Sequence, residues 1–256
     1  MDVTNRFVLD FAKRYAARHP GAKVLDFGCG AGAVVAAGRA AGIDMLGADV
    51  FYAGSDSRAA AERSGLLGTV IHEIRDGALP FAGAAFDLVT ANQVFEHVEN
   101  LDADLREICR VMQPGATLLS IFPARDVFRE GHIGIPFSHW LPKGSRARLW
   151  YTWTLRSLGA GTWKQQAPTR RQWALDKLGW IDTYTHYRSR KEIFGAFRRY
   201  FVSELREPDY IRYRLKDSAR LAPLARVLDI PGVPAVASAV FRKLAFLVIV
   251  SRKAER

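Results

Sequence analysis

Cysteine and long apolar runs are both scarce in this chain of 256 residues. The two cysteines, Cys29 and Cys109, lie in a glycine-rich stretch and in an expected helix, which excludes a disulfide framework as the basis of the fold. The longest strongly apolar run near the carboxyl terminus, residues 244–250, is too short to span a bilayer. The first ten residues lack the basic start and apolar run of a secretory signal. These absences predict a cytoplasmic protein with reduced thiols and no transmembrane segment.

The content of hydrophobic residues, 49%, and of charged residues, 25%, is ordinary for a globular protein. The charge is unevenly spread: residues 1–140 carry 13 basic and 17 acidic side chains, whereas residues 141–256 carry 24 and 9. A basic half next to a mildly acidic half suggests an acidic partner, which could be a phosphorylated or carboxylated small molecule, an anionic membrane surface or nucleic acid. The alternative is a solvated basic surface with no specific partner.

Short apolar runs alternate with helical patterns over the first half of the chain. The runs that predict strands are residues 23–27, 44–49, 69–73, 86–91 and 116–122. The stretches that predict helices are residues 33–41, 58–64 and 101–112. Strands that alternate with helices indicate an α/β fold with a parallel sheet and helices on both faces.

A glycine-rich loop, GCGAG at residues 28–32, follows the first predicted strand. In such sheets ligands bind at the carboxyl ends of the strands, and glycines let the backbone approach them closely. Asp26, inside the preceding strand, would repel a pyrophosphate but suits a ligand with a positive amino-acid head group. The loop also lacks the later glycine of the dinucleotide-binding pattern.

The stretch VLDFGCGAG (residues 24–32) resembles the first motif of the class I S-adenosylmethionine-dependent methyltransferases. The resemblance continues through GADVF (47–51), DGALPFAGAAFDLV (76–89), EHV (96–98) and ICRVMQPGATLLSIFP (108–123). These motifs look most like the small-molecule branch that includes the ubiquinone and menaquinone methyltransferases. The resemblance implies S-adenosylmethionine as cofactor and S-adenosylhomocysteine as product. It also implies a Rossmann-like, mostly parallel seven-stranded sheet whose last strand is antiparallel.

The resemblance assigns a set of residues to the cofactor. Asp26 would help to hold the amino group of the methionine portion, Asp49 would accept hydrogen bonds from both ribose hydroxyls, and Asp76 would accept one from the adenine amino group. The other members would leave room for the methionine portion, lie against the adenine or line the region near the sulfonium. The full set is Asp26, Gly28, Gly30, Gly32, Asp49, Val50, Phe51, Asp76, Gly77, Asn92 and Gln93. Glu96 and His97 are interpreted as residues that orient a helix or the wall of the site.

The chain is expected to form a single methyltransferase domain, residues 1–256, with three parts. Residues 1–126 would be the cofactor-binding core, and residues 127–185 a helical insertion after the fifth strand that caps the acceptor side. Residues 186–256 would complete the sheet with a helix at 190–200 and strands at 201–205 and 244–250, separated by a proline-rich excursion at 207–240. Insertions at this point of the fold commonly select the substrate.

The insertion is rich in tryptophan and in basic residues, with one amphipathic helix expected at residues 149–158. Mixed aromatic and basic side chains could hold a planar or glycosidic group beside a phosphate, or lie against an anionic lipid surface. Alternatively, the tryptophans form the small core of the cap itself. The residues concerned are Trp140, Trp150, Trp153, Trp163 and Trp173, with Lys143, Arg146, Arg148, Arg156 and Lys164 among them.

Two histidines, His132 and His139, lie in the stretch EGHIGIPFSHW at residues 130–140. Imidazole is the side chain best suited to act as a general base near neutral pH, so both are candidate catalytic residues; a purely structural role is the alternative for each. No metal site is expected, because no cysteine cluster or H-x-x-x-H spacing accompanies them and acids are scarce after Glu130.

The sequence therefore predicts a methyltransferase that modifies a small-molecule, lipid-linked or sugar-linked acceptor, at oxygen, by in-line transfer with histidine as an optional base. The basic half would recognise a phosphate or carboxylate on the acceptor, and contact with an anionic membrane would make the protein peripheral to it. An RNA methyltransferase is the alternative enzyme, disfavoured because Ala91-Asn-Gln-Val94 replaces the motif typical of base-amine methylation and no RNA-binding domain is visible. A non-catalytic binding subunit is the third possibility, against which the intact glycine loop argues.

Overall fold

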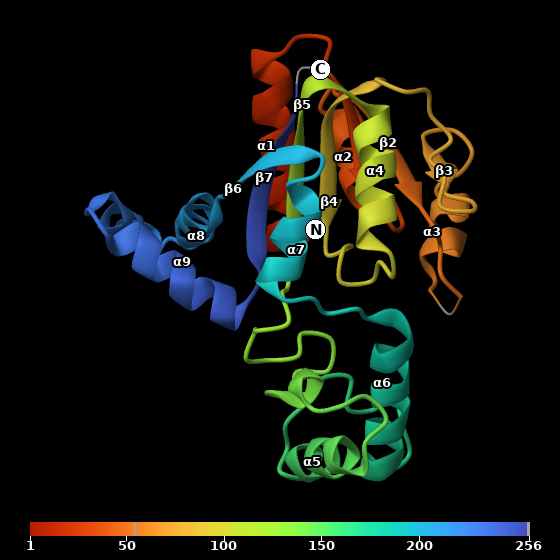
Figure 1. Ribbon diagram of the computed structural model, residues 1–256, viewed down its shortest axis with the longest axis vertical. Coiled ribbons are helices and arrows are strands. Elements are labelled where there is room, and N and C mark those ends of the chain that lie inside the picture. The colour runs from red at the N-terminus through yellow and green to blue at the C-terminus, as the bar shows by residue number, and fades with distance from the viewer. Residues whose placement is uncertain (54, 255–256) are drawn as a thin grey trace.

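Seven strands form one sheet in the computed structural model, which describes residues 1–53 and 55–254 (Figure 1). The strands are β1 (Lys23–Phe27), β2 (Asp44–Asp49), β3 (Ile71–Glu73), β4 (Phe86–Asn92), β5 (Met112–Phe122), β6 (Phe201–Leu205) and β7 (Leu247–Lys253). Their order across the sheet is β3-β2-β1-β4-β5-β7-β6. Each pairing among β1 to β5 is parallel, and β7 runs antiparallel to both β5 and β6. The predicted fold class is confirmed.

The order of strands reverses between β1 and β4, because the chain first moves outward to β3 and then returns to pair β4 with β1. At such a switch point the loops that follow the two strands diverge and leave a crevice at the carboxyl edge of the sheet. The glycine loop follows β1, Asn92 ends β4 and Gln93 comes next, so both predicted binding segments lie at this crevice.

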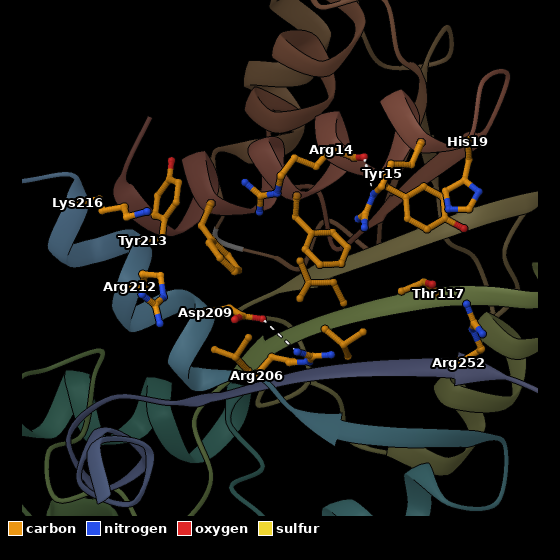
Figure 2. A pocket seen from close by; sticks show the side chains of 16 residues that line it. Arg14, Tyr15, His19, Thr117, Arg206, Asp209, Arg212, Tyr213, Lys216 and Arg252 are labelled. Atoms are coloured by element: carbon orange, nitrogen blue, oxygen red, sulfur yellow. Dashed lines mark hydrogen bonds and ion pairs between the residues drawn. The ribbon is translucent and has the colours of Figure 1, made fainter. Parts of the chain in front are cut away.

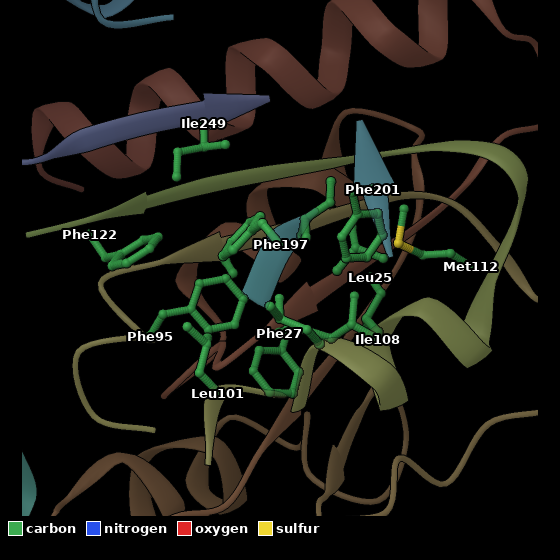
Figure 3. Packing of buried hydrophobic residues seen from close by; sticks show 14 of the residues in the cluster. Leu25, Phe27, Phe95, Leu101, Ile108, Met112, Phe122, Phe197, Phe201 and Ile249 are labelled. Carbon is green, nitrogen blue, oxygen red and sulfur yellow. The ribbon is translucent and has the colours of Figure 1, made fainter. Parts of the chain in front are cut away.

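Helices cover both faces of the sheet. The helices α1 (Val3–Arg18) and α2 (Ala33–Ala40) pack on one face, while α4 (Leu101–Val111) and α7 (Arg190–Phe197) pack on the other, and the short α3 (Ser57–Arg63) follows β2. Side chains alternate along the strands, so each face has its own core. Figure 3 shows the core under α4 and α7, where the Phe95 ring meets Phe122 and Phe197 edge to face. The helix α1 was not among the predicted elements.

The segment between β5 and α7 forms a helical cap that lies beyond the carboxyl ends of the parallel strands (Figure 1). It contains η1 (Ser138–Trp140), α5 (Arg146–Ser157) and α6 (Arg170–Tyr184). Its core is a separate cluster that includes Ile133, Ile135 and Trp173, with Trp153 and Trp180 packed against it. Trp153 and Trp173 therefore belong to the core of the cap, as one of the two interpretations expected. Trp150 and Trp163 do not, because they are 66% and 64% exposed. The division of the chain at residues 127 and 185 stays a prediction.

The predicted proline-rich excursion at 207–240 is largely helical. It contains α8 (Glu207–Lys216), η2 (Ala222–Asp229) and α9 (Val233–Leu244). Pro208, Pro223 and Pro234 each occupy the first or second position of one of these helices, where the missing N–H is harmless and the fixed φ favours helix. The prolines therefore begin helices here and do not mark an irregular loop.

Four strands differ in their boundaries from the sequence prediction: β3 begins two residues later and β4 ends one residue later, while β5 and β7 differ more. β7 begins at Leu247, three residues later than expected, because Leu244 still belongs to α9. β5 begins at Met112 and includes Pro114 and Gly115, with a register irregularity against β4 that absorbs the proline. Within residues 1–53 and 55–254, no helix has the length and apolar character needed to cross a membrane.

Candidate active site

The three glycines of the loop after β1 all adopt positive φ, with values of 73° at Gly28, 53° at Gly30 and 83° at Gly32. A Cβ atom at Gly28 would lie 2.3 Å from a methyl carbon of Val94, and one at Gly32 would lie 2.2 Å from Ile71 Cδ1. The loop therefore requires glycine both for its backbone conformation and for its packing. It leaves the backbone bare at the switch point, where a ligand can approach it.

Replacement of Gly28 by alanine should lower the free energy of unfolding by about 1–3 kcal/mol more than replacement of Gly42 does. Both glycines have positive φ, but a Cβ at Gly42 would meet nothing within 4 Å, so Gly42→Ala carries the backbone strain without the overlap with Val94. Urea denaturation of the two variants measures the difference. Equal losses would mean that the loop moves aside and that Val94 does not constrain it.

Asp26 lies in β1 with its side chain pointing toward β4. Its Oδ1 accepts a hydrogen bond of 2.7 Å from Thr90 Oγ1, and the residue is 5% exposed. Burial raises the pKa of Asp26 to about 7, and the nearby Asp49 carboxylate adds to this effect, whereas the Thr90 hydrogen bond opposes it. A carboxyl group held in this way gains much from a cationic ligand, because the cation would stabilise its ionised form.

Asp49, the last residue of β2, organises the loops on either side of it. Its Oδ2 accepts from the Gly30 amide at 2.8 Å and its Oδ1 from the Phe51 amide at 2.7 Å. These bonds fix the carboxylate at the carboxyl edge, and each oxygen retains capacity for a ligand hydroxyl. Val50 is 57% exposed, and Phe51, with φ of 48°, lies under the Arg58 guanidinium at 5.8 Å.

Asp76 and Gly77 form the tip of a tight turn beyond β3. Both have positive φ, 51° and 72°, and the Ala78 amide closes the turn by donating to the Arg75 carbonyl at 2.9 Å. Asp76 is exposed. The turn is tied to the site through Ile74, whose amide donates to the Asp49 carbonyl at 2.9 Å.

Asn92 is the last residue of β4, and Gln93 follows it at the switch point. Asn92 Nδ2 donates to Asn5 Oδ1 at 2.8 Å, so the start of α1 reaches the site, a contact that the sequence did not indicate. Gln93 is exposed and has φ of 56°, a strained conformation for a residue other than glycine. Its amide donates to the Ile121 carbonyl at 2.7 Å, which holds this conformation in place.

The loop after β4 joins the glycine loop to the cap. Val94 lies against Gly28, and the Phe95 ring lies 6.1 Å from that of Phe27. On the other side, the Arg188 guanidinium donates to the carbonyls of Phe95, Val98 and Glu99. This clamp fixes the loop, with Glu96 and His97 on it, to the segment that follows α6.

His132 from the cap meets His97 from this loop, with 3.3 Å between their Nε2 atoms. His97 Nδ1 lies 2.7 Å from the Tyr184 carbonyl oxygen, and His132 Nδ1 lies 2.7 Å from Glu130 Oε1. Burial lowers the pKa of His97, with a smaller contribution from His132. The Trp180 ring packs against both imidazoles, at 5.9 Å and 5.2 Å between centroids. We call His97 and His132 the histidine pair.

Two buried acids support the histidine pair. Glu130 accepts hydrogen bonds from His132, from the Tyr187 hydroxyl at 2.6 Å and from the Ile133 amide at 2.7 Å. Burial acts to raise the pKa of Glu130, but these hydrogen bonds outweigh it and the pKa is lowered. Glu96 is 1% exposed, and neither of its carboxylate oxygens has a hydrogen-bond partner among the described residues. Burial, assisted by Glu130, raises the pKa of Glu96 to about 8.

His139 does not join the histidine pair and lies on another side of Tyr187, with 5.0 Å between ring centroids. Its Nε2 is 3.1 Å from the Arg125 carbonyl oxygen, and burial lowers its pKa. It lines a cavity of about 370 Å³ in the cap, together with Arg125, Trp140, Leu141, Pro142, Lys143, Arg148, Ile181, Thr185 and Tyr187. Of the two predicted bases, only His132 is therefore positioned against a second imidazole and a supporting carboxylate.

Three of the five basic residues named in the sequence analysis of the cap, Lys143, Arg148 and Arg156, form contacts within it. Arg148 is 2% exposed and forms an ion pair with Asp182, and Lys143 donates to the Asp182 and Thr185 carbonyls at 2.9 Å and 2.8 Å. Arg156 lies over the Trp173 ring at 5.5 Å. These contacts explain part of the positive charge of the second half without a partner.

A second hollow, a cleft of about 630 Å³, lies between α1 and α8 on the face of the sheet (Figure 2). Its floor includes the apolar side chains of Leu119, Val248 and Val250 from β5 and β7. The basic residues around it are Arg14, Arg18, Arg206, Arg212, Lys216 and Arg252. Because it opens on a face of the sheet and not at the carboxyl ends of β1 and β4, it is separate from the switch-point crevice. We call it the basic cleft.

The residues around the histidine pair were the part of the site that sequence reasoning missed. Glu96 and His97 were interpreted as wall residues, and Glu130 and Tyr187 were given no role. The available indication was that a carboxylate and a histidine recur close together twice, at 96–97 and at 130–132. The sequence does not reveal that these two segments meet.

The chain is similar to known methyltransferases in sequence and in fold. A family model described as a methyltransferase domain matches residues 3–188, which is most of the chain. The chain is 28% identical to a ubiquinone biosynthesis O-methyltransferase of Sinorhizobium medicae over 162 residues, 56% of this chain and 60% of the relative. It is 34% identical to a malonyl-[acyl-carrier protein] O-methyltransferase of Erwinia billingiae over 106 residues, 41% of this chain and 40% of the relative.

Among solved structures, a methyltransferase from Mesorhizobium loti superimposes with a TM-score of 0.53 at 19% identity. The match covers 96% of this chain and all of that one, and at this identity it shows the shared fold. The chain spans 60% or less of the length of the two curated relatives, and the match to the Sinorhizobium protein covers only 56% of this chain.

Proposed function

The chain belongs to the class I S-adenosylmethionine-dependent methyltransferases, and on that premise we propose that it transfers the methyl group to an oxygen atom of an acidic small-molecule acceptor. S-adenosylmethionine is the cofactor and S-adenosylhomocysteine the product. The names of both curated relatives describe O-methyltransferases, which supports oxygen as the atom that receives the methyl group.

We propose that the cofactor lies across the switch point. Asp26 would face the ammonium group of the methionine portion, Asp49 the ribose hydroxyls, and Val50 and Phe51 the adenine. The bare backbone of the glycine loop supports this arrangement, as do the two amide hydrogen bonds that fix the Asp49 carboxylate. For Asp76, with Gly77, an adenine contact is proposed from the resemblance, and its exposed position leaves it free to reach a ligand.

The histidine pair is the observation that carries the proposed chemistry. It is linked to the glycine loop through Val94 and Phe95, and Glu130 orients His132 as a carboxylate orients an imidazole in acid–base catalysis. The sulfonium supplies the leaving group, so the protein has to hold the acceptor in line and remove its hydroxyl proton. In the overall step the acceptor O–CH3 bond forms, the S–CH3 bond breaks and the hydroxyl proton leaves at this pair.

We propose that the cavity in the cap holds the acidic end of the acceptor. His139 and Arg125 line it, and Tyr187 links it to the histidine pair, because the Tyr187 hydroxyl donates to Glu130 at 2.6 Å. His139 would then contact the acceptor, whereas His132 would act on the hydroxyl that is methylated.

The basic cleft favours a second proposal, peripheral contact with an anionic membrane surface or with an acceptor anchored there. Six basic side chains surround an apolar floor, a combination that suits an acidic headgroup with an attached chain. RNA, the alternative polyanion, would be bound through the same positive charge and with steep dependence on salt.

A labelled-methyl transfer assay with three kinds of acceptor tests the proposed function. Small-molecule extracts, vesicles that contain anionic lipid and bulk RNA are each incubated with the protein and S-adenosylmethionine. Label should enter a small molecule or a lipid-linked molecule and be released by treatments that cleave ethers or esters. Label in RNA, or in none of the three fractions while S-adenosylhomocysteine binds, would contradict the proposal.

Binding of S-adenosylhomocysteine should weaken as the pH falls below 7. Asp26, whose pKa is raised to about 7, must be ionised to pair with the ligand's ammonium group, so affinity should fall by up to about tenfold per pH unit on the acidic side and level off above it. Equilibrium dialysis between pH 5.5 and 8 measures this. The Asp26→Asn variant should bind more weakly and without this pH dependence; an unchanged slope in that variant would assign the effect to another group.

A further inference from the structure

We infer that Glu96, His97 and His132 bind one divalent transition-metal ion, with Zn²⁺ as the best-matched species. Within residues 1–53 and 55–254 these three side chains form the group whose ligand atoms all come within 4.8 Å of one another. They come from the loop after β4 and from the cap, so the ion would join the two parts of the chain at the proposed reaction centre.

The positions of the hydrogen atoms on the two imidazoles point to a cation between them. The Tyr184 carbonyl can only accept, so His97 Nδ1 carries a hydrogen. Glu130 accepts three hydrogen bonds, one of them from His132 Nδ1. In neutral imidazoles both Nε2 atoms then have lone pairs, which face each other at 3.3 Å. Such an arrangement is repulsive unless a proton or a metal ion lies between the lone pairs.

The spacing of the nitrogen atoms matches a tetrahedral ion. Two nitrogens bound at about 2.0–2.1 Å to one tetrahedral centre lie roughly 3.3–3.4 Å apart. The observed separation between His97 Nε2 and His132 Nε2 is 3.3 Å. Hydrogen bonds donated by N–H groups are usually 2.7–3.2 Å long, so 3.3 Å is at the long limit for a hydrogen bond between the two rings.

Glu96 supplies the third ligand. It is almost fully buried and both of its oxygens are without hydrogen-bond partners among the described residues, although a buried carboxylate is costly unless it is paired or binds a metal. Its distance from the nitrogens, at most 4.8 Å, is up to about 1.5 Å beyond tetrahedral ligand spacing, so its side chain would rotate toward the ion on binding.

The outer contacts are those of a metal site. Histidine ligands in proteins donate their second ring N–H to a carboxylate or a backbone carbonyl, which fixes the ring orientation. Here His132 has Glu130 and His97 has the Tyr184 carbonyl. Two imidazoles and one carboxylate favour Zn²⁺, Co²⁺ or Fe²⁺ over Mg²⁺, which prefers oxygen ligands and octahedral geometry.

Three protein ligands leave one tetrahedral position open. Resting on the proposed function, we assign this position to the acceptor hydroxyl: coordination lowers its pKa, its proton passes to water, and the oxygen then takes the methyl group from sulfur. His132 would then act on the acceptor through the ion and not as a free base.

Ion binding is tested without cofactor or acceptor, so its outcome is independent of the proposed function. The full chain is stripped with a chelator and titrated calorimetrically with Zn²⁺ alone. One ion per chain should bind, millimolar Mg²⁺ should not compete, and the affinity should fall at least about 100-fold in His97→Ala and His132→Ala. Glu130→Gln, which alters only an outer contact, should lower the affinity about 10- to 100-fold. His19→Ala, at an exposed histidine outside the cluster, is the matched control and should bind as the parent does.

A spectroscopic measurement on the unaltered chain tests the inference even if the variants fail to fold. Co²⁺ bound at this site should show the strong visible absorption of four-coordinate cobalt and should be displaced by one equivalent of Zn²⁺. Zn²⁺ binding that is equal in the parent and in the His97→Ala/His132→Ala double variant, or only the weak spectrum of hydrated Co²⁺, would overturn the inference.

Discussion

Replacement of His132 by alanine should lower kcat for methyl transfer about 100- to 10,000-fold, the range expected when a group that activates the acceptor is lost. The imidazole is held by Glu130 at 2.7 Å and faces His97 at 3.3 Å, so no neighbouring side chain can take over its position. Binding of S-adenosylhomocysteine should stay unchanged, because the residues proposed for the cofactor lie at and after the ends of β1, β2 and β3. Single-turnover kinetics, with dialysis for the affinity, separate the two quantities.

His139→Ala supplies the contrast within the same stretch of the cap. His139 lines the cavity that we assign to the acidic end of the acceptor and does not touch the histidine pair, so its removal should raise KM with a much smaller change in kcat. If His132→Ala left kcat unchanged, or if His139→Ala lowered it as much, the histidine pair would not be the centre of the reaction.

Asp49→Ala should weaken the binding of S-adenosylmethionine about 100-fold or more. The carboxylate would accept hydrogen bonds from both ribose hydroxyls, and loss of a charged acceptor costs ~1.5–3 kcal/mol per bond, where 1.4 kcal/mol is tenfold in affinity. The same oxygens hold the Gly30 and Phe51 amides, so both adjoining loops would also lose their anchor. Equilibrium dialysis with labelled cofactor measures the loss.

Asp44→Ala is the matched control, because Asp44 is an exposed aspartate at the opposite end of the same strand. Its contact with Arg39, at 4.0 Å, is a surface ion pair of little energetic value. The control should bind cofactor normally. An equal loss in both variants would indicate a general effect on β2 and would remove Asp49 from the proposed binding site.

The strands of the first half were predictable because each is a short apolar run that ends at a turn or at glycine. Residues 23–27 and 44–49 match β1 and β2 without adjustment. The glycine loop was equally predictable, because its glycines and the preceding Asp26 all lie within seven consecutive residues, 26–32. Local pattern alone was sufficient in these places.

Other elements were harder to predict from the sequence, and the physical reason differs between them. Pro208, Pro223 and Pro234 lie in the segment predicted only as a proline-rich excursion, and each lies in the first turn of a helix, where proline is favoured. The helix α1 owes its packing to contacts with α2, β4 and α8, which the local sequence does not show.

The histidine pair could not be predicted at all from spacing, because His97 and His132 belong to different parts of the chain and meet only after the cap has folded. The expectation that no metal site is present relied on ligand spacing within the insertion alone. That criterion does not cover a site whose ligands come from two segments.

Calorimetric titration with S-adenosylhomocysteine tests the central claim, that the carboxyl edge around the glycine loop binds the cofactor. We predict saturable binding of one ligand per chain, retained in Asp44→Ala and lost or strongly weakened in Asp49→Ala. The titration is repeated at two temperatures, since the heat of binding can pass through zero at one of them. Absence of heat at both temperatures, or binding that is unaffected by Asp49→Ala, would contradict the account.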